Sequence, residues 1–241
     1  MARSSQRPMA EDAMFGQGKP KRPEVVAFDI IETVFPLDPL RPTIVELGLP
    51  PSGLENWFAA GLRDAFALSS TGDFRPFPEV LDGALDQVLG EQGLSPPVEA
   101  KALLKERMKS LAARPDAREA FRIILRAGMR IMALSNGAAA TTRLLLQGAG
   151  LDDLVGHVVS VEEVKLFKPR REVYEHAVRT AGVEPERLAL VAVHPWDVHG
   201  AKATGLTTAY VSVERPFSPV MRRPDLEAAS LSEAALALVA L

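Results

Sequence analysis

Short apolar runs alternate with helical patterns along most of the chain, and this alternation limits the fold more than any other feature of the sequence. The runs are rich in β-branched residues and short enough to be strands buried on both faces. They lie at Val25–Asp29, Arg130–Leu134, Leu188–Val193 and Thr207–Val213, with a weaker run at His157–Val161. Strands separated by helices imply right-handed crossovers and a parallel sheet. The sequence therefore predicts a doubly wound α/β fold with helices on both faces of the sheet.

One long stretch, from about residue 37 to 113, breaks this alternation because it has helical patterns but no convincing strand. We predict that residues 37–113 form an all-helical insert in a core made of residues 23–36 and 114–241. Residues 1–22 mix polar, charged, Gly and Pro residues without apolar periodicity, which predicts a disordered tail. The helical patterns are Leu54–Leu68, Pro78–Leu89 and Pro97–Leu111 in the insert, and Asp116–Ala127, Ala139–Ala149, Arg171–Ala181 and Val198–Thr204 in the core.

Composition excludes several classes of function. The net charge of −3 leaves no basic excess for a surface that binds nucleic acid. Cysteine is absent, which removes disulfides, thiolate metal sites and cysteine nucleophiles. No apolar run approaches the ~20 residues that span a bilayer, and the first residues lack a signal-peptide pattern. We therefore expect a cytoplasmic protein that acts on a small molecule, with no nucleic-acid or membrane partner.

Polar side chains follow the apolar runs at the predicted strand ends, where open parallel sheets bind their ligands. A carboxylate held there beside a fixed cation and hydroxyl groups stays ionised and can attack carbon or phosphorus. Asp29 is the predicted nucleophile, Lys168 the cation that neutralises charge, and Thr33 and Ser135 the hydroxyl groups that orient substrate oxygens. The strand-end residues are Asp29, Ile30, Ile31, Glu32 and Thr33, then Ser135, Asn136 and Gly137, then Lys168, and finally His194, Trp196 and Asp197.

Four segments in this order resemble the motifs of the haloacid dehalogenase (HAD) superfamily, whose members have a Rossmann-like core and a helical cap. The segments are FDIIETVF, ALSNG, VKLFKPRREVYEHA and VAVHPWDVHGAKATGL. Within the superfamily, LSNG, FKP followed by VYE, and WD-x-x-GAK are most similar to the type II branch, the L-2-haloacid dehalogenases. The resemblance extends over nearly the whole chain from residue 24.

The resemblance implies a hydrolase in which Asp29 forms an ester with a short 2-halo carboxylic acid, and water then releases a 2-hydroxy acid. Thr33 and Ser135 would position Asp29, Lys168 would anchor the charge cluster, and Asp197 would line the site. No cofactor or metal is implied, and dimerisation through the cap is compatible with the branch. The substrate-facing residues would be Ile30, Ile31, Asn136, Gly137, Phe58, Arg63, Tyr174 and Trp196.

The chain departs from the family pattern in ways that bear on its chemistry. Ile31 stands where superfamily phosphatases carry a second Asp, their general acid, and Glu32 replaces a Gly. The arginine that receives halide in the type II branch aligns near Phe58, with Arg63 as the nearest arginine and Arg41 further upstream. His194 stands where that branch has Asn, and an imidazole can activate the hydrolytic water. His194 is as well explained by a turn that it caps.

Two other functions remain open from the sequence. The first is a magnesium-dependent phosphatase, with Asp29, Asp197 and the backbone carbonyl of Ile31 around the metal, although Ile31 argues against it. The second is a member of the superfamily that binds a metabolite or protein without turnover. An activity assay separates the three hypotheses. Halide release without metal supports the dehalogenase, magnesium-dependent phosphate release supports the phosphatase, and neither activity supports the binding protein.

Overall fold

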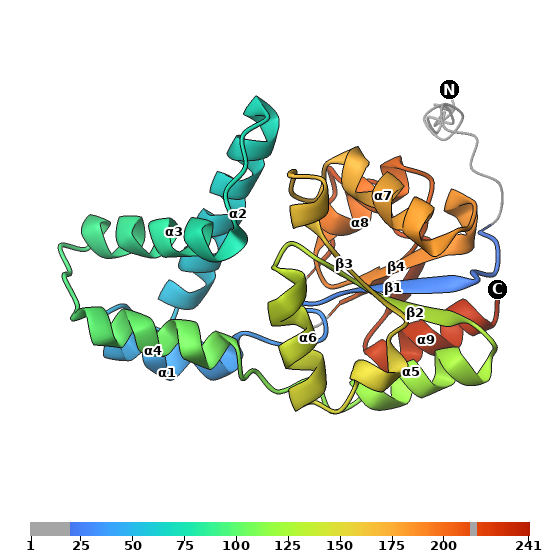
Figure 1. Cartoon of the computed structure of the whole chain (residues 1–241), viewed down its shortest axis with the longest axis horizontal. Helices are drawn as coiled ribbons and strands as arrows, with labels where there is room; N and C mark the ends of the chain where they lie inside the picture. Colours follow the sequence, from blue (N-terminus) through green and yellow to red (C-terminus); the bar gives the residue numbers. More distant parts are fainter. Residues whose placement is uncertain (1–19, 213–215) are drawn as a thin grey trace, which may run out of the picture.

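The computed structural model describes residues 20–212 and 216–241, and within these ranges it places six parallel strands in one sheet (Figure 1). The strand order is β3-β2-β1-β4-β5-β6. This confirms the predicted parallel α/β sheet, whereas most of the tail predicted for residues 1–22 lies outside the described residues. The strands are β1 (Val25–Asp29), β2 (Arg130–Ser135), β3 (His157–Ser160), β4 (Leu188–Ala192), β5 (Thr207–Val211) and β6 (Leu226–Ala228).

Helices cover both faces of the sheet. Helices α7 (Arg171–Ala181) and α8 (Pro195–Ala203) lie on one face, and α5 (Ala117–Arg126) and α9 (Leu231–Val239) lie on the other (Figure 1). Helix α6 (Ala139–Gly148) packs on β2 and β3. Strands β1, β4 and β5 are buried along their whole length, which explains their continuous apolar sequences. None of the helices described has both the length and the apolar character needed to cross a membrane.

The structure corrects several predicted element bounds. Strand β6 and helix α9 are absent from the prediction, because β6 is three residues long and contains a glutamate, so it has no apolar run. Helix α8 begins at Pro195 rather than Val198, and proline is favoured in the first helical turn because it needs no N–H partner there. Strands β4 and β5 end one and two residues earlier than predicted, at Ala192 and Val211.

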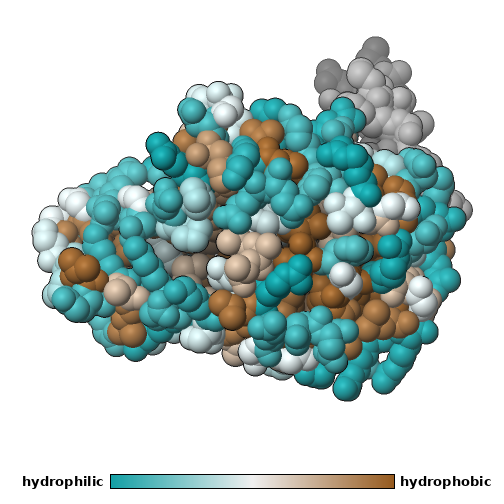
Figure 2. Space-filling model, in the orientation of Figure 1, coloured by the Kyte–Doolittle hydropathy of each residue, from teal (hydrophilic) through white to brown (hydrophobic). Residues whose placement is uncertain are grey.

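Residues 38–108, which we call the helical segment, contain only helices and the turns between them. Helix α2 packs along α3, and α1 packs along α4, to the left of the sheet in Figure 1. On the face drawn in Figure 2 hydrophilic residues predominate, with smaller hydrophobic areas between them. The helical elements are η1 (Asp38–Leu40), α1 (Arg41–Glu46), α2 (Gly53–Thr71), α3 (Phe77–Glu91) and α4 (Val98–Met108).

Arg114 ties together the two places where the chain passes between the sheet and the helical segment. Its guanidinium donates to the carbonyl oxygens of Glu32 (2.8 Å) and Thr33 (2.9 Å), and its backbone N–H donates to Val34 O (2.8 Å). Glu32 has a φ of +71°, a left-handed conformation that is uncommon for residues other than glycine. Its side chain accepts a hydrogen bond from Leu37 N (2.7 Å), so contacts on both sides stabilise this conformation.

Candidate active site

The strand order reverses between β1 and β4, because the chain builds one side of the sheet through β3 and then crosses to the other. Ligands of open parallel sheets bind at such a switch point, outside the carboxyl ends of the strands. Asp29 ends β1, and Val193 and His194 follow β4. The topology therefore brings the predicted nucleophile and the histidine to the same edge of the sheet.

Asp29 is held by two hydrogen bonds from buried partners. Thr33 Oγ1 donates to Asp29 Oδ2 (2.6 Å), and Lys168 Nζ donates to Asp29 Oδ1 (2.8 Å). Thr33 in turn accepts a hydrogen bond from Val193 N (3.1 Å), which fixes the direction of its hydroxyl hydrogen. Thr33 is fully buried. It therefore orients Asp29 rather than contacting the substrate.

Lys168 lies between two carboxylates and is fully buried. Its ammonium donates to Asp29 Oδ1, to Asp197 Oδ2 (2.7 Å) and to Leu134 O (3.0 Å). Burial alone would lower the pKa of Lys168, but Asp197 and Asp29 outweigh it and hold that pKa above its usual value. Lys168 is thus charged at neutral pH and compensates one of the two neighbouring carboxylate charges.

Tyr174 binds a carboxylate of this cluster and does not face the substrate. It is fully buried, and its hydroxyl donates to Asp197 Oδ1 (2.6 Å). Burial, and then the charge of Asp197, raise the pKa of Tyr174 well above its usual value, so the hydroxyl keeps its proton and remains a donor. Burial also raises the pKa of Asp197, an effect that Lys168 opposes. Tyr174 and Lys168 together position Asp197.

Gly200 allows α8 to lie against this cluster, and we expect Gly200→Ala to destabilise the protein. A Cβ at this position would lie 2.6 Å from Pro169 Cβ and 2.7 Å from the Tyr174 hydroxyl oxygen. Inserting a methyl group into such a packed site costs about 1–3 kcal/mol. Urea unfolding followed by circular dichroism measures this loss.

Gly83→Ala is the matched control for that substitution. Gly83 lies within α3, and a Cβ there meets no atom within 4 Å. Alanine is the better helix former, so this change should stabilise the protein by about 0.5–1 kcal/mol. Equal effects of the two substitutions would contradict the close packing inferred at Gly200.

His194 packs against two aromatic rings. Its ring stacks on Trp196 with centroids 5.0 Å apart, and Phe58 lies on it at 6.0 Å. Burial lowers the pKa of His194 below its usual value, although Asp29 and Asp197 act in the opposite direction. The imidazole is therefore neutral near pH 7. Its Nε2 atom lies 4.0 Å from Asp29 Oδ2 and has no hydrogen-bond partner.

Asn136 has a second buried side-chain atom without a hydrogen-bond partner. Its Oδ1 accepts a hydrogen bond from Lys168 N (3.0 Å), which assigns the other atom of the amide, Nδ2, as a donor without a protein partner. Ser135 Oγ accepts from Gly137 N (2.9 Å) and thereby shapes the turn after β2. Within residues 20–212 and 216–241, buried side-chain nitrogen and oxygen atoms without a partner are confined to Asn136 Nδ2 and His194 Nε2.

A small cavity of about 10 Å³ lies beside Asp29, and we call it the Asp29 cavity. Roughly 10–15 Å³ is the least volume that holds a water molecule, so this space admits a single water at most. Both unpaired side chains belong to its lining. The lining residues are Asp29, Ile31, Phe58, Leu62, Phe77, Ser135, Asn136, Gly137, His194 and Trp196.

Three residues predicted to face the substrate lie elsewhere. Arg63 is exposed on α2 and bonds Asp64 and Gln87, so the structure does not bring it to Asp29. Ile30 and Tyr174 are buried outside the lining of the Asp29 cavity. Arg41, the other arginine considered for halide, bonds Glu55 near the start of α2.

Leu62 and Phe77 line the Asp29 cavity and were missed from the sequence. Both are apolar residues of the helical segment, and no chemical signature separates them from core residues. The described residues contain no group of three or more His, Asp or Glu side chains arranged to hold a metal ion.

Comparisons with known proteins identify the family to which the chain is similar. A family model for haloacid dehalogenase-like hydrolases matches residues 24–205. Haloacetate dehalogenase H-2 of Moraxella sp. (strain B) is 27% identical over 195 residues, which cover 80% of this chain and 87% of that protein. The (S)-2-haloacid dehalogenase of Pseudomonas sp. (strain YL) is 26% identical over 210 residues, covering 86% and 90%.

The fold agrees as well. The solved structure of L-2-haloacid dehalogenase from Xanthobacter autotrophicus with chloropropionic acid covalently bound has a TM-score of 0.78 and 24% identity, covering 89% of this chain and 97% of that one. These findings confirm the superfamily that the four sequence motifs indicated. Because the family model matches the chain from β1 through α8, the protein belongs to the haloacid dehalogenase-like hydrolases.

Proposed function

We propose that the protein is a 2-haloacid dehalogenase that converts a 2-halo carboxylic acid into a 2-hydroxy acid through an ester of Asp29. The observation that carries this proposal is the Asp29 carboxylate, held by Lys168 and Thr33 at the sheet's switch point and facing His194. The two relatives of the protein named above are a haloacetate dehalogenase and an (S)-2-haloacid dehalogenase, which supports 2-halo carboxylic acids as the substrate class.

In the first step an oxygen of Asp29 attacks C2 of the acid. A C–O bond forms, the carbon–halogen bond breaks, and halide leaves with the bonding electron pair. Lys168 and Thr33 hold the carboxylate at a fixed angle, so little conformational entropy is lost as it reacts. Asn136 Nδ2 is available to donate a hydrogen bond to the bound acid or to the leaving halide.

In the second step water attacks the Asp29 carboxyl carbon and His194 takes its proton. His194 belongs to the lining of the Asp29 cavity, and its unpaired Nε2 lies 4.0 Å from Asp29 Oδ2, next to the carboxyl carbon that the water attacks. A neutral imidazole is the form that accepts a proton, and burial among Phe58 and Trp196 keeps His194 in that form. The bond between the carboxyl carbon and the oxygen bound to C2 then breaks, and that oxygen, which came from Asp29, takes the proton from His194 and becomes the 2-hydroxyl. The second proton of the water is released to solvent as the Asp29 carboxylate forms again.

The proposed chemistry needs no metal, because Lys168 already places a positive charge between Asp29 and Asp197. We also propose that residues 37–113 act as a cap over the core, since Phe58, Leu62 and Phe77 of α2 and α3 line the Asp29 cavity. Closing such a segment excludes bulk water until the ester has formed.

The test is incubation with L-2-chloropropionate and a metal chelator in H₂¹⁸O, with chloride assayed and Asp29 peptides weighed by mass spectrometry. We expect chloride release and ¹⁸O in Asp29 after repeated turnover, because the hydrolytic water leaves its oxygen in the carboxylate. In a separate assay with a phosphate ester and no chelator, phosphate release that depends on magnesium would support a phosphatase if no chloride is released in the first assay. Neither activity in folded protein would indicate a binding role.

His194→Asn should slow hydrolysis of the ester by about 10²–10⁴-fold, because it removes the general base. The expected result is one chloride released per protein molecule in a rapid phase, followed by slow turnover, with the mass of the ester retained on Asp29. In the unaltered protein, turnover falls as pH drops through the His194 pKa. Since burial lowers that pKa, the fall occurs below the ordinary histidine value of about 6.5.

His157→Asn provides the control, because His157 is exposed at the start of β3, away from Asp29. It should keep both the turnover and the acid limb of the pH profile. A His194→Asn variant that turns over at the original rate with the original pH profile would rule out this base.

A further inference from the structure

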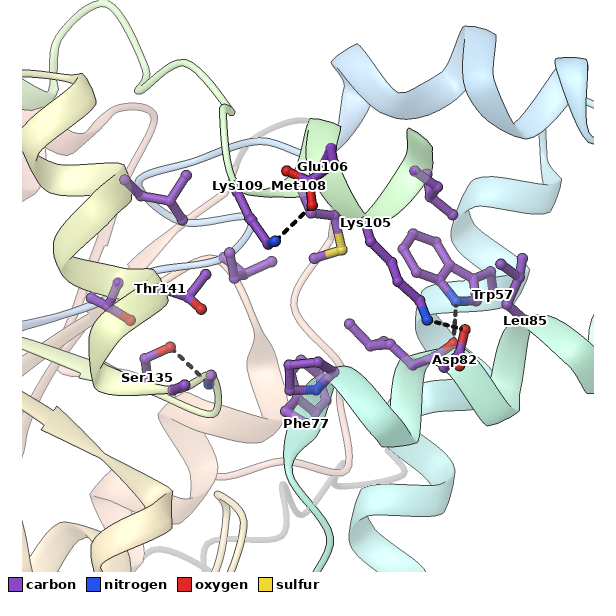
Figure 3. Close-up of a pocket in the computed structure, with 18 of the residues that line it drawn as sticks. Trp57, Phe77, Asp82, Leu85, Lys105, Glu106, Met108, Lys109, Ser135 and Thr141 are labelled. Carbon is purple, nitrogen blue, oxygen red and sulfur yellow. Dashed lines mark hydrogen bonds and ion pairs between the residues drawn. The ribbon is translucent and has the colours of Figure 1, made fainter. Parts of the chain in front are cut away.

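A much larger cavity adjoins the Asp29 cavity. It has a volume of about 330 Å³ and lies between the β2–α6 turn and the helical segment. Figure 3 shows Thr141 of α6 and Ser135 of β2 on one side, and Trp57 of α2 and Leu85 of α3 on the other. We call this space the apolar cavity. Ligand pockets in proteins typically measure about 300–1,000 Å³, so it is large enough for part of a small molecule.

The two cavities share part of their walls next to Asp29, which itself lines the smaller one. Four residues line both of them: Ile31, Phe77, Ser135 and Gly137. The Asp29 cavity itself admits no more than a single water, so it offers no room for a substituent on C2 of an acid attacked by Asp29. The apolar cavity is the adjoining space in which such a substituent fits.

The wall of the apolar cavity favours uncharged groups. Trp57, Leu81 and Leu85 line it, and the Trp57 indole N–H is already bonded to Leu81 O (2.8 Å). The two lysines of the lining are paired with carboxylates, Lys105 with Asp82 (2.9 Å) and Lys109 with Glu106 (2.7 Å), as the dashed lines in Figure 3 show. An incoming negative charge would therefore meet no unpaired lysine there.

We propose that the apolar cavity binds an alkyl or aryl substituent on C2 of the substrate. The inference rests on the proposed function, in which Asp29 attacks C2. It makes the preferred substrates medium-chain or aryl-substituted 2-halo acids rather than the short acids expected from the sequence. Each methylene that leaves water for an apolar wall favours binding by about fourfold. Fixing the flexible alkyl group of the substrate costs entropy, which offsets part of this gain. We therefore expect kcat/KM to rise on the order of 100-fold from 2-chloropropionate to 2-chlorooctanoate.

Thr141→Phe tests the proposal by filling the cavity. Thr141 is half-buried on α6 and belongs to the lining, so a phenyl ring there competes with the substituent for space. We expect the ratio of kcat/KM for 2-chlorooctanoate over 2-chloropropionate to fall by more than about tenfold. Ala140→Phe is the matched control, because Ala140 is exposed on the same helix and outside the lining. It should leave the ratio unchanged.

Octanoate, which carries no halogen, separates a failure of this proposal from a failure of the proposed function. It should raise the Tm of the unaltered protein and of Ala140→Phe, but not of Thr141→Phe, while propionate has little effect. Selective stabilisation by octanoate without halide release from any acid would support the binding site and overturn the dehalogenase chemistry. Equal kcat/KM for both chloroacids would overturn the substituent site and leave the chemistry intact. An equal loss of kcat/KM for both chloroacids in Thr141→Phe would also overturn the substituent site, because the cavity would then serve only as a path by which substrates enter.

Discussion

Asp29→Asn should abolish halide release, lowering turnover on the order of 10⁴-fold or more. The amide oxygen is a poor nucleophile, whereas the shape of the side chain and its contact with Thr33 are preserved. Lys168 keeps its second carboxylate partner, Asp197. The variant should therefore remain folded, and mass spectrometry should find no ester after incubation with a 2-halo acid.

Asp225→Asn is a suitable control for this experiment. Asp225 is a half-buried carboxylate that pairs with Lys202, and its side chain accepts hydrogen bonds from Thr208 next to α8. This substitution removes an equal charge far from the nucleophile and should leave chloride release unchanged. Turnover by verified Asp29→Asn protein at a rate close to the original would mean that another group attacks the substrate.

Lys168→Met should have the largest effect on stability. The substitution leaves Asp29 and Asp197 buried beside each other without their shared cation. Breaking a buried ion pair by removing one partner costs about 3–5 kcal/mol. We expect a loss of this size in the free energy of unfolding, measured with urea, together with loss of halide release. Lys202→Met, which breaks the more exposed pair with Asp225, should cost less.

The double variant Lys168→Met/Asp197→Asn tests the cause of that loss. It has one buried carboxylate charge where the single variant has two, so part of the stability should return, with a coupling of roughly 0.5–3 kcal/mol. If the two substitutions change the free energy of unfolding additively, the loss in Lys168→Met does not come from repulsion between the two buried carboxylates.

The effect of pH on Lys168→Met follows from the same cluster. Burial raises the pKa of Asp197 in the folded state and Lys168 opposes this, so removing the cation raises the pKa of Asp197 further above its unfolded value. A group with a raised folded pKa favours folding at low pH and opposes it as pH rises. The stability difference from the unaltered protein should therefore shrink as pH falls.

Most of the sheet was predictable because its buried strands are continuous apolar runs in the sequence. Strands β1, β4 and β5 are buried on both faces and read as apolar runs, whereas β6 is a short edge strand whose pairing depends on β5. Helix α9 consists largely of small and apolar residues, so it lacks the polar face that marks a surface helix.

The charged part of the site was predictable for a similar reason. Asp29, Lys168 and His194 are polar residues next to apolar runs, and parallel strands bring such positions to a shared edge. The depth of a side chain was not predictable. Nothing in the spacing of Tyr174 tells that it lies beneath Asp197, and nothing in the sequence around Arg63 tells that its helix turns it towards solvent.

Arg114 also bears on how the cap proposed above would open. By joining Glu32 and Thr33 to the returning chain, it places the axis of any rigid-body rotation of the helical segment beside the loop that follows Asp29. Displacement grows with distance from an axis, so α3 and α4 would move more in such a rotation than Asp29, which lies next to the axis. The reacting group would therefore keep its alignment while the cap opens and closes.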